Sequence, residues 1–459
     1  MVFSSIPFLF FFLPIVLICY YLVPFKLKNY VLLVFSLIFY AWGEPVYIIL
    51  MIFSCLLNYF YALYHDKVKN KKLLFILCIV ANLLILGFFK YADFLIDIIN
   101  SIFRLNINPL KLALPIGISF FTFQTMSYSI DVYRSSVVPE RNFFYFTTYV
   151  SMFPQLIAGP IVRYETISKE LYKRDINFNN FSDGLLRFMQ GLFKKVLIAN
   201  NIGYLWTTLS SMESLSIASA WLGIIAYTFQ IYFDFSAYSD MAIGMGKMLG
   251  FNYLENFNYP YISKSVTEFW RRWHISLSSW FKDYVYIPLG GSKCSRIKHI
   301  RNILIVWCLT GIWHGASYNF MLWGLYYGII LIIEKFFLKD FLSKLPNTLK
   351  HIYTMLVVII GWLIFASTDL SMFSVYFSNM FNIFKYPFID ETFIFYFKSY
   401  FIIIVISTLL SMPIYQNIKK KLNSRGWMII SLILYLVFFF ITVSYLVSDS
   451  YNPFLYFRF

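Results

Sequence analysis

Charged residues are scarce in this chain of 459 residues: only 13% are Asp, Glu, Lys or Arg, whereas 60% are hydrophobic and 22% are aromatic. A soluble domain carries roughly 25% charged residues. The mean hydropathy of +0.67 is correspondingly high. This composition excludes a soluble enzyme and predicts an all-α polytopic membrane protein, because helices satisfy their own backbone hydrogen bonds within a membrane.

Cysteine is also scarce, with five residues in the whole chain. They are scattered, show no metal-ligand spacing, and four of them lie in apolar runs, where cysteine usually serves as a small hydrophobic residue. We therefore expect no disulfide, no metal site and no tightly bound cofactor.

Acidic residues are outnumbered by basic ones, 22 to 38, and the formal net charge is +16. The lysines cluster in loops, where the positive-inside rule and contacts with anionic membrane lipids account for them. The positive charge therefore requires no nucleic-acid partner. Residues Met1–Tyr21 lack a basic leading region and a cleavage site, so we expect a first membrane span there and not a signal peptide.

The apolar segments predict about 11–13 transmembrane or re-entrant helices in a single membrane domain, residues 1–459. The expected spans lie at roughly 6–24, 30–43, 46–64, 72–89, 113–130, 143–162, 185–206, 218–249, 303–333, 351–367, 398–415 and 427–448. The basic segments His65–Lys72 and Lys419–Arg425 are expected in the cytoplasm. Counting spans back from the first segment places the N-terminus outside, and the last span after the second segment places Tyr451–Phe459 on the outer side.

His314 is a candidate catalytic residue because it lies inside a long apolar run, Ile303–Ile333. An ionisable residue at membrane depth is costly and usually marks a functional site. The run is too long for one straight span and short for two spans with a loop. We expect it to bend, with an irregularity at Gly311–Gly315 that faces a cavity.

A second histidine, His274, follows an amphipathic pattern. Apolar residues recur here at spacings of three and four, which predicts one helix that starts near Thr267. These residues are Val266, Trp270, Trp273, Leu277, Trp280 and Tyr284. A helix with tryptophans and basic residues ordinarily lies in the membrane interface. His274, on or beside the apolar stripe, is then either a water-facing residue or part of a site.

Several segments resemble the membrane-bound O-acyltransferase (MBOAT) family, in its alginate O-acetyltransferase-like bacterial branch. They are Leu114–Phe120, Phe153–Ile161, Tyr232–Asp240, Phe269–Ser278, Tyr286–Gly291 and Trp313–Gly315. Each motif alone is weak, but their number and order make the resemblance specific.

The resemblance implies a ring of tilted helices around a central funnel, with a catalytic core at about residues 115–335. It places the family's histidine at His314 and a second polar position at His274. Transfer of an acetyl group from a thioester to a hydroxyl needs a base, which a neutral imidazole can supply. The oxyanion needs donors, for which His274, Trp313 and backbone amides are candidates. The implied co-substrate is a cytoplasmic acetyl donor such as acetyl-CoA.

Polar residues beside the motifs are candidates for supporting roles. Asp234, Tyr238 and Asp240 lie in an apolar span, where carboxylates are expensive unless paired. They form either a structural network with Trp313 or part of the site. Three arginines, Arg271, Arg272 and the weaker candidate Arg163, could bind the donor's phosphates, although arginines in such positions more often make contacts within the helix or with lipid headgroups.

The C-terminal segment Pro453–Phe459 has two interpretations. Its aromatic residues fit an anchor at the membrane interface. The ending also resembles an F-x-Y-F signature at the C-termini of glycopolymer acyltransferase systems, which implies that Tyr456 carries the acyl group. A phenol ester is an activated acyl carrier, which suits covalent catalysis. The expected position of this segment on the outer side of the membrane agrees with such a relay.

The resemblance implies a multi-pass subunit of the bacterial inner (cytoplasmic) membrane that exports acetyl groups for O-acetylation of a cell-surface polysaccharide. An alginate-like exopolysaccharide, peptidoglycan and other wall glycans are the candidate acceptors. The implied partner is an extracytoplasmic SGNH-hydrolase-like O-acetyltransferase, because this chain has no soluble domain to hold a polymer. One alternative is D-alanyl transfer to teichoic acid. Another is a polysaccharide transporter or flippase, which predicts inverted repeats. A scaffold without chemistry requires that His314 be dispensable.

Overall fold

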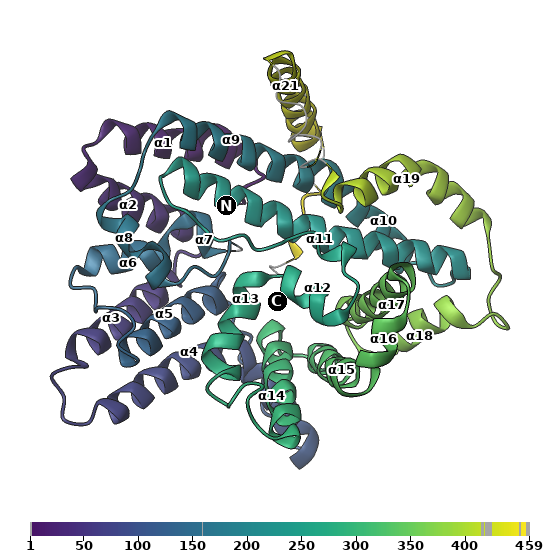
Figure 1. Ribbon diagram of the computed structural model, residues 1–459, viewed down its shortest axis with the longest axis horizontal. Coiled ribbons are helices and arrows are strands. Elements are labelled where there is room, and N and C mark those ends of the chain that lie inside the picture. Colours follow the sequence, from purple (N-terminus) through teal and green to yellow (C-terminus); the bar gives the residue numbers. More distant parts are fainter. Residues whose placement is uncertain (1, 158, 415–416, 418–424, 449–450, 456–459) are drawn as a thin grey trace. The chain divides into compact units, whose positions relative to one another are not determined.

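The computed structural model describes residues 2–157, 159–414, 417, 425–448 and 451–455, and the regular secondary structure of these residues is helical (Figure 1). The predicted all-α class is therefore confirmed. The chain divides into two compact units, of which unit 1 comprises Met1–Phe188 and Tyr238–Glu255 and unit 2 comprises Met189–Ala237 and Asn256–Phe459. The single domain over residues 1–459 stays a prediction.

The helices of unit 1 come largely from the first part of the chain. They are η1 (Phe8–Phe12), α1 (Leu13–Leu22), α2 (Phe25–Gly43), α3 (Ile48–Tyr64), α4 (Lys71–Phe103), α5 (Ile118–Tyr133), α6 (Phe143–Ser151), α7 (Phe153–Leu156) and α8 (Tyr164–Tyr172). Helices α9 (Phe178–Phe193) and α11 (Ile217–Met248) contribute residues to both units.

Unit 2 holds the remaining helices. They are η2 (Lys194–Asn200), α10 (Asn201–Ser210), η3 (Pro260–Ile262), α12 (Val266–Arg272), α13 (Ile275–Phe281), η4 (Lys282–Tyr286), α14 (Arg296–His314), α15 (Tyr318–Ile333), η5 (Glu334–Leu338), α16 (Lys339–Lys344), α17 (Asn347–Ala366), α18 (Leu370–Phe381), α19 (Glu391–Leu410) and α21 (Arg425–Ser448).

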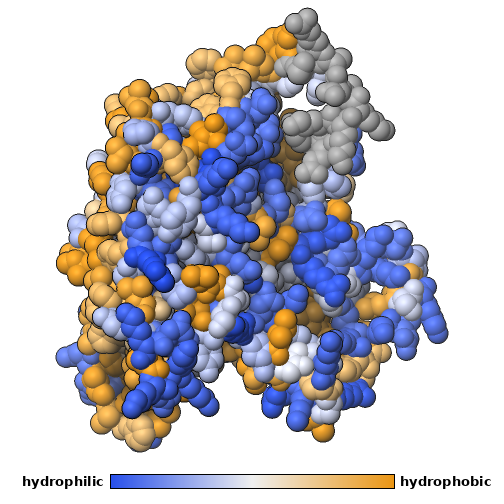
Figure 2. Space-filling model, turned by 60° about the vertical axis from the view of Figure 1, so that its left-hand side comes forward, coloured by the Kyte–Doolittle hydropathy of each residue, from blue (hydrophilic) through white to orange (hydrophobic). Residues whose placement is uncertain are grey.

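Six helices in the described part of the chain are long and apolar enough to cross a membrane. They are Phe25–Gly43, Lys71–Phe103, Tyr318–Lys344, Asn347–Ala366, Glu391–Leu410 and Ile429–Ser448, and the shorter apolar helices are Phe8–Leu22 and Ile48–Tyr64. Figure 2 shows broad hydrophobic areas on the surface, as a lipid environment requires. The chain is a membrane protein, and the expected total of about 11–13 elements stays a prediction.

Several expected spans have different bounds in the structure; the span expected at 72–89, for example, is α4, which continues to Phe103. The span expected at 143–162 is two short helices, because Met152 leaves the helical conformation after α6 and Pro154 lies in the first turn of α7. The span expected at 185–206 is longer: helical residues continue from α9 through η2 into α10.

The long apolar run around His314 is two helices and not one bent segment. Helix α14 starts at Arg296, before the apolar run, and continues through Gly311 to His314. The extended residues Gly315 and Ser317 then connect it to α15. The predicted irregularity therefore lies just after His314, because α14 begins early enough to leave room for a second helix.

Helices α14 and α15 lie side by side, and a pair of glycines brings their backbones into contact (Figure 1). A Cβ atom at Gly311 would lie 2.4 Å from the carbonyl oxygen of Phe320, and one at Gly324 would lie 2.4 Å from that of Trp307. No side chain fits at either position. The close packing fixes the end of α14, and therefore His314.

The tryptophans of the amphipathic pattern pack inside unit 2. The ring of Trp270 lies 4.7 Å from that of Tyr327, and the ring of Trp273 lies 4.7 Å from that of Trp362. Trp273, Leu277 and Trp280 are buried. The apolar stripe therefore joins α12 and α13 to a protein core, where aromatic pairs add to the burial of their area.

We predict that Gly311→Ala destabilises the protein by about 1–3 kcal/mol, because the added methyl group meets a backbone carbonyl that cannot rotate away. Thermal unfolding of the detergent-purified protein measures the effect. Gly87→Ala is the matched control, since a Cβ at Gly87 meets no atom within 4 Å. Equal melting temperatures for the two variants would contradict the close packing.

Candidate active site

The segment around His274 is two short helices, which corrects the single amphipathic helix predicted from the spacing. Helix α12 ends at Arg272, Trp273 is extended, and His274 adopts the left-handed conformation with φ 42° before α13 starts at Ile275. A left-handed histidine is uncommon and needs surrounding contacts to hold it. Asn256 supplies these contacts.

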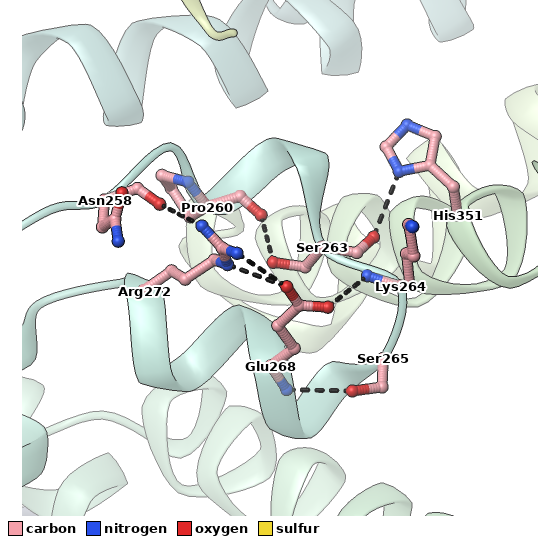
Figure 3. A network of polar contacts seen from close by, with 8 residues as sticks. All are labelled: Asn258, Pro260, Ser263, Lys264, Ser265, Glu268, Arg272 and His351. Carbon is pink, nitrogen blue, oxygen red and sulfur yellow. Dashed lines mark hydrogen bonds and ion pairs between the residues drawn. The ribbon is translucent and has the colours of Figure 1, made fainter. Parts of the chain in front are cut away.

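Helix α12 begins at Val266, one residue before the predicted start near Thr267, and a capping network holds this end (Figure 3). The Ser265 hydroxyl accepts a hydrogen bond from the Glu268 N–H at 3.0 Å, as an N-cap does. The Glu268 carboxylate accepts from the Lys264 N–H at 2.9 Å and binds Arg272 at 2.9 Å. Arg272 also donates to the Asn258 carbonyl at 3.0 Å. Arg272 therefore fixes the local fold.

A buried carboxylate from η5 completes the start of α12. Glu334 accepts hydrogen bonds from the N–H groups of Val266 and Thr267 at 2.7 and 3.0 Å, and from the Thr267 hydroxyl at 2.6 Å. Negative charge at a helix N-terminus is favourable. These bonds tie the helix that precedes His274 to the end of α15.

Asn256 fixes both the position and the tautomer of His274. Its Oδ1 accepts a hydrogen bond from the Ser276 N–H at 3.2 Å, which identifies that side-chain atom as the oxygen. The same oxygen lies 3.0 Å from Nδ1 of His274. Nδ1 must therefore carry the proton, and Nε2 of the neutral ring holds the lone pair.

Burial keeps His274 neutral. The side chain lies outside the candidate membrane spans and is only 2% exposed, and desolvation lowers its pKa to about 3. The ring of Phe235 packs edge-on against it at 4.6 Å. At neutral pH this imidazole can accept a proton through Nε2 but has none to donate there.

His314 is the last residue of α14 and is enclosed by aromatic rings. The rings of Trp323 and Phe365 lie edge-on to it at 4.9 and 5.2 Å. The Trp313 ring lies 5.0 Å from that of His314 and 6.3 Å from that of His274. One indole thus stands beside both imidazoles.

The two histidines line one cavity of about 360 Å³ in unit 2. Residues of α12, α13 and α14 form most of its wall, which also includes the basic residues Arg271 and Lys282. An apolar cavity with two imidazoles and cations at its wall suits proton transfer beside an anionic ligand. Arg272 is not among the lining residues.

The remaining predicted site residues lie in different places. Asp234 pairs with Lys195 at 2.7 Å in unit 2, and Asp240 pairs with Arg187 at 2.6 Å in unit 1. Tyr238 is buried in unit 1, where its ring stacks on that of Phe3 at 5.3 Å.

The site roles predicted for Arg163 and Tyr456 stay predictions. Arg163 belongs to unit 1, where it directly precedes α8. Tyr456 lies outside the described residues, as do Lys419–Lys421 of the second predicted cytoplasmic segment.

Sequence reasoning missed three polar residues that organise this unit: Asn256, Lys195 and Glu334. Lys195 offered a signal, because it lies within the span expected at 185–206 and is unusual at such depth. Glu334, at the end of the apolar run 303–333, offered a weaker one. Asn256 offered none, because its partner is eighteen positions away and in a turn that the helical pattern concealed.

Comparison with known proteins identifies the class. The model of MBOAT, the membrane-bound O-acyltransferase family, matches residues 126–378. The chain therefore belongs to the membrane-bound O-acyltransferase family, and it is an acyltransferase.

Relatives with assigned names cover most of the chain. It is 43% identical over 380 residues to the probable alginate O-acetylase AlgI of Pseudomonas aeruginosa, across 81% of this chain and 73% of that protein. It is 36% identical over 409 residues to the peptidoglycan O-acetyltransferase of Helicobacter pylori, across 81% and 78%. The teichoic acid D-alanyltransferase of Bacillus subtilis is 31% identical over 238 residues, across 49% and 60%.

We predict that the neutral state of His274 makes stability depend on pH. Between the ordinary pKa of 6.5 and the lowered value of about 3, the unfolded chain binds a proton that the folded chain does not. Stability therefore falls as the pH drops below 6.5, by roughly 1.4 kcal/mol per unit from this residue. Thermal unfolding at pH 7.5 and 5.5 should show a larger loss for the wild type than for His274→Gln. Equal losses would mean that the ring is protonated in the folded state.

Proposed function

We propose that this protein is a multi-pass O-acetyltransferase of the bacterial cytoplasmic membrane, which supplies acetyl groups for the O-acetylation of a cell-surface polysaccharide. The observation that carries the proposal is the cavity lined by His274 and His314 in a chain of this family. The names of the relatives, which refer to alginate and peptidoglycan O-acetylation, indicate that the transferred group is acetyl and that the acceptor is a glycan.

In the proposed chemistry, an acetyl thioester such as acetyl-CoA enters the cavity as a co-substrate. His314 takes the proton of the attacking hydroxyl as its oxygen bonds to the acetyl carbon, and the C–S bond then breaks. The leaving thiolate receives that proton. Arg271 and Lys282, on the same wall, suit the phosphates of the donor.

The tautomer of His274 limits its role in this scheme. With Nδ1–H directed to Asn256, the neutral ring offers only a lone pair to a ligand, so it does not fit an oxyanion donor. Of the predicted donors, backbone amides and Trp313 Nε1–H remain, and Trp313 is not itself among the residues that line the cavity. His274 fits a proton acceptor, and it is the second candidate for the base.

The product side of the reaction is proposed to lie outside the cytoplasm. Tyr456 receives the acetyl group as a phenol ester and passes it to an extracytoplasmic SGNH-hydrolase-like O-acetyltransferase, which holds the glycan. The sequence count that places residues 451–459 outside supports this direction.

The competing function within the family is D-alanyl transfer to teichoic acid. The relatives with that name match only 49% of this chain, at 31% and 28% identity, whereas those named for acetylation match 81–83%. The longer and stronger similarity favours the acetyl branch. A transporter is a rival of another class, which needs no base.

We predict that deletion of the gene removes ester-linked acetate from a surface glycan and that wild type restores it, whereas His314→Ala does not. Loss of a general base lowers the rate by roughly 10²–10⁴-fold. Mild base releases the esters from purified glycans, and acetate and D-alanine are quantified separately at matched membrane levels of protein. His274→Ala, tested in parallel, separates the two candidate bases.

The alternatives have their own outcomes in this experiment. D-alanine that follows the same pattern would move the protein to the teichoic-acid branch. Full restoration of acetate by His314→Ala would remove the proposed base and favour a transporter or a scaffold.

We predict that Tyr456→Phe abolishes glycan acetylation while leaving the protein at wild-type levels in the membrane, because phenylalanine keeps the ring but has no hydroxyl to acylate. Mass spectrometry of the C-terminal peptide should show an acetyl adduct on the wild type alone. An aromatic anchor predicts the opposite result, with acetylation intact in Tyr456→Phe.

A further inference from the structure

Unit 2 contains a buried charge pair that has no role in the proposed chemistry. Lys195 of η2 and Asp234 of α11 lie 2.7 Å apart, and their side chains are 1% and 3% exposed. Both belong to unit 2, and both lie in apolar helical segments. Burying two charges costs several kcal/mol per ion, and apolar residues of similar size would often serve stability as well. Stability alone therefore does not explain the pair.

The pair holds the main chain of the C-terminal segment. The ammonium group of Lys195 donates a hydrogen bond to the carbonyl oxygen of Pro453. The other carboxylate oxygen of Asp234 accepts one from the N–H of Leu455 at 2.8 Å. One donor and one acceptor thus bind the carbonyl and the amide on either side of Phe454.

Neighbouring contacts extend the same binding site. Lys195 also donates to Oδ1 of Asn200 at 2.8 Å, and the Asn200 amide donates to Oδ1 of Asn452 at 3.1 Å. Phe454 and Leu455 are only 5% and 6% exposed, and Leu455 joins the hydrophobic core of unit 2. Four successive residues of the segment are therefore held before Tyr456.

We propose that the Lys195–Asp234 pair is the docking site for the C-terminal segment of this chain, and that docking is required for acetyl transfer. The requirement of docking for acetyl transfer rests on the proposed relay through Tyr456. The two residues are positioning residues: they bind the backbone of Pro453 and Leu455, and so fix the point in the chain from which Tyr456 continues. A hydrogen bond to an ionised partner is about twice as strong as a neutral one, which suits a fixed attachment.

Hydrogen–deuterium exchange of the Leu455 amide tests the docking directly, because this amide donates the bond to Asp234. The full-length protein is purified in detergent, and exchange is followed in the peptic peptide that carries Leu455. Asp234→Asn should accelerate exchange by about tenfold or more, as expected when a hydrogen bond to a charged group is lost.

A second variant separates docking from folding. Asp234→Asn leaves the Lys195 charge buried and can destabilise the helices. The double variant Lys195→Met with Asp234→Leu removes both charges and keeps apolar volume, so it should fold, yet it offers no bond to the segment. Asp183→Asn is the matched control: it breaks an exposed pair with Lys247 in unit 1 and should leave exchange and acetylation unchanged.

Measurements of acetylation and of hydrogen exchange together distinguish the docking site from the requirement of docking for acetyl transfer. The expected result is fast Leu455 exchange and lost acetylation in the double variant, at a wild-type membrane level. Slow exchange in the double variant would overturn the docking site. Fast exchange with full acetylation would overturn the requirement, even where Tyr456→Phe is inactive. If Tyr456→Phe remains active, the relay is wrong, whereas fast exchange in the double variant still supports the docking site.

Discussion

Desolvation is the constraint on which the second unit of this protein depends. A charged or polar group buried among apolar helices must find a partner, and the described residues meet this requirement with few side chains. Glu334 closes the start of α12, Asn256 holds the imidazole of His274, and Asp234 pairs with Lys195. Each of these bonds joins elements that are distant in sequence. The same requirement that makes polar groups expensive therefore positions the catalytic candidates.

The site joins two kinds of support. The α14–α15 pair sets His314 through backbone contact at Gly311 and Gly324, which leaves no space for adjustment. His274 is set by a left-handed turn and one amide oxygen. The first depends on the absence of side chains and the second on a specific side chain. Both bring an imidazole to the wall of the same cavity.

The sequence was sufficient for the class and the family, because composition and motif order carry that information locally, whereas the catalytic roles of the two histidines stay predictions. It was insufficient for the break at His274, since the spacing of Val266, Trp270 and Trp273 satisfies a continuous helix. The break depends on Asn256, which the helical pattern does not include. It was also insufficient for the turn after His314, because span length was judged from apolar residues alone, whereas α14 starts in the basic segment at Arg296. The positive-inside rule assigns lysines to loops, and Lys195 is an exception that lies buried against Asp234.

The C-terminal segment is held by its main chain, and this has a consequence for how such a chain can diverge. Bonds to the carbonyl of Pro453 and the amide of Leu455 depend little on which side chains stand there. What they fix is the number of residues between the end of α21 at Ser448 and the amide of Leu455, and from there to Tyr456. One inserted residue would displace both bonds, so the length of this stretch is constrained in addition to its buried side chains, Phe454 and Leu455.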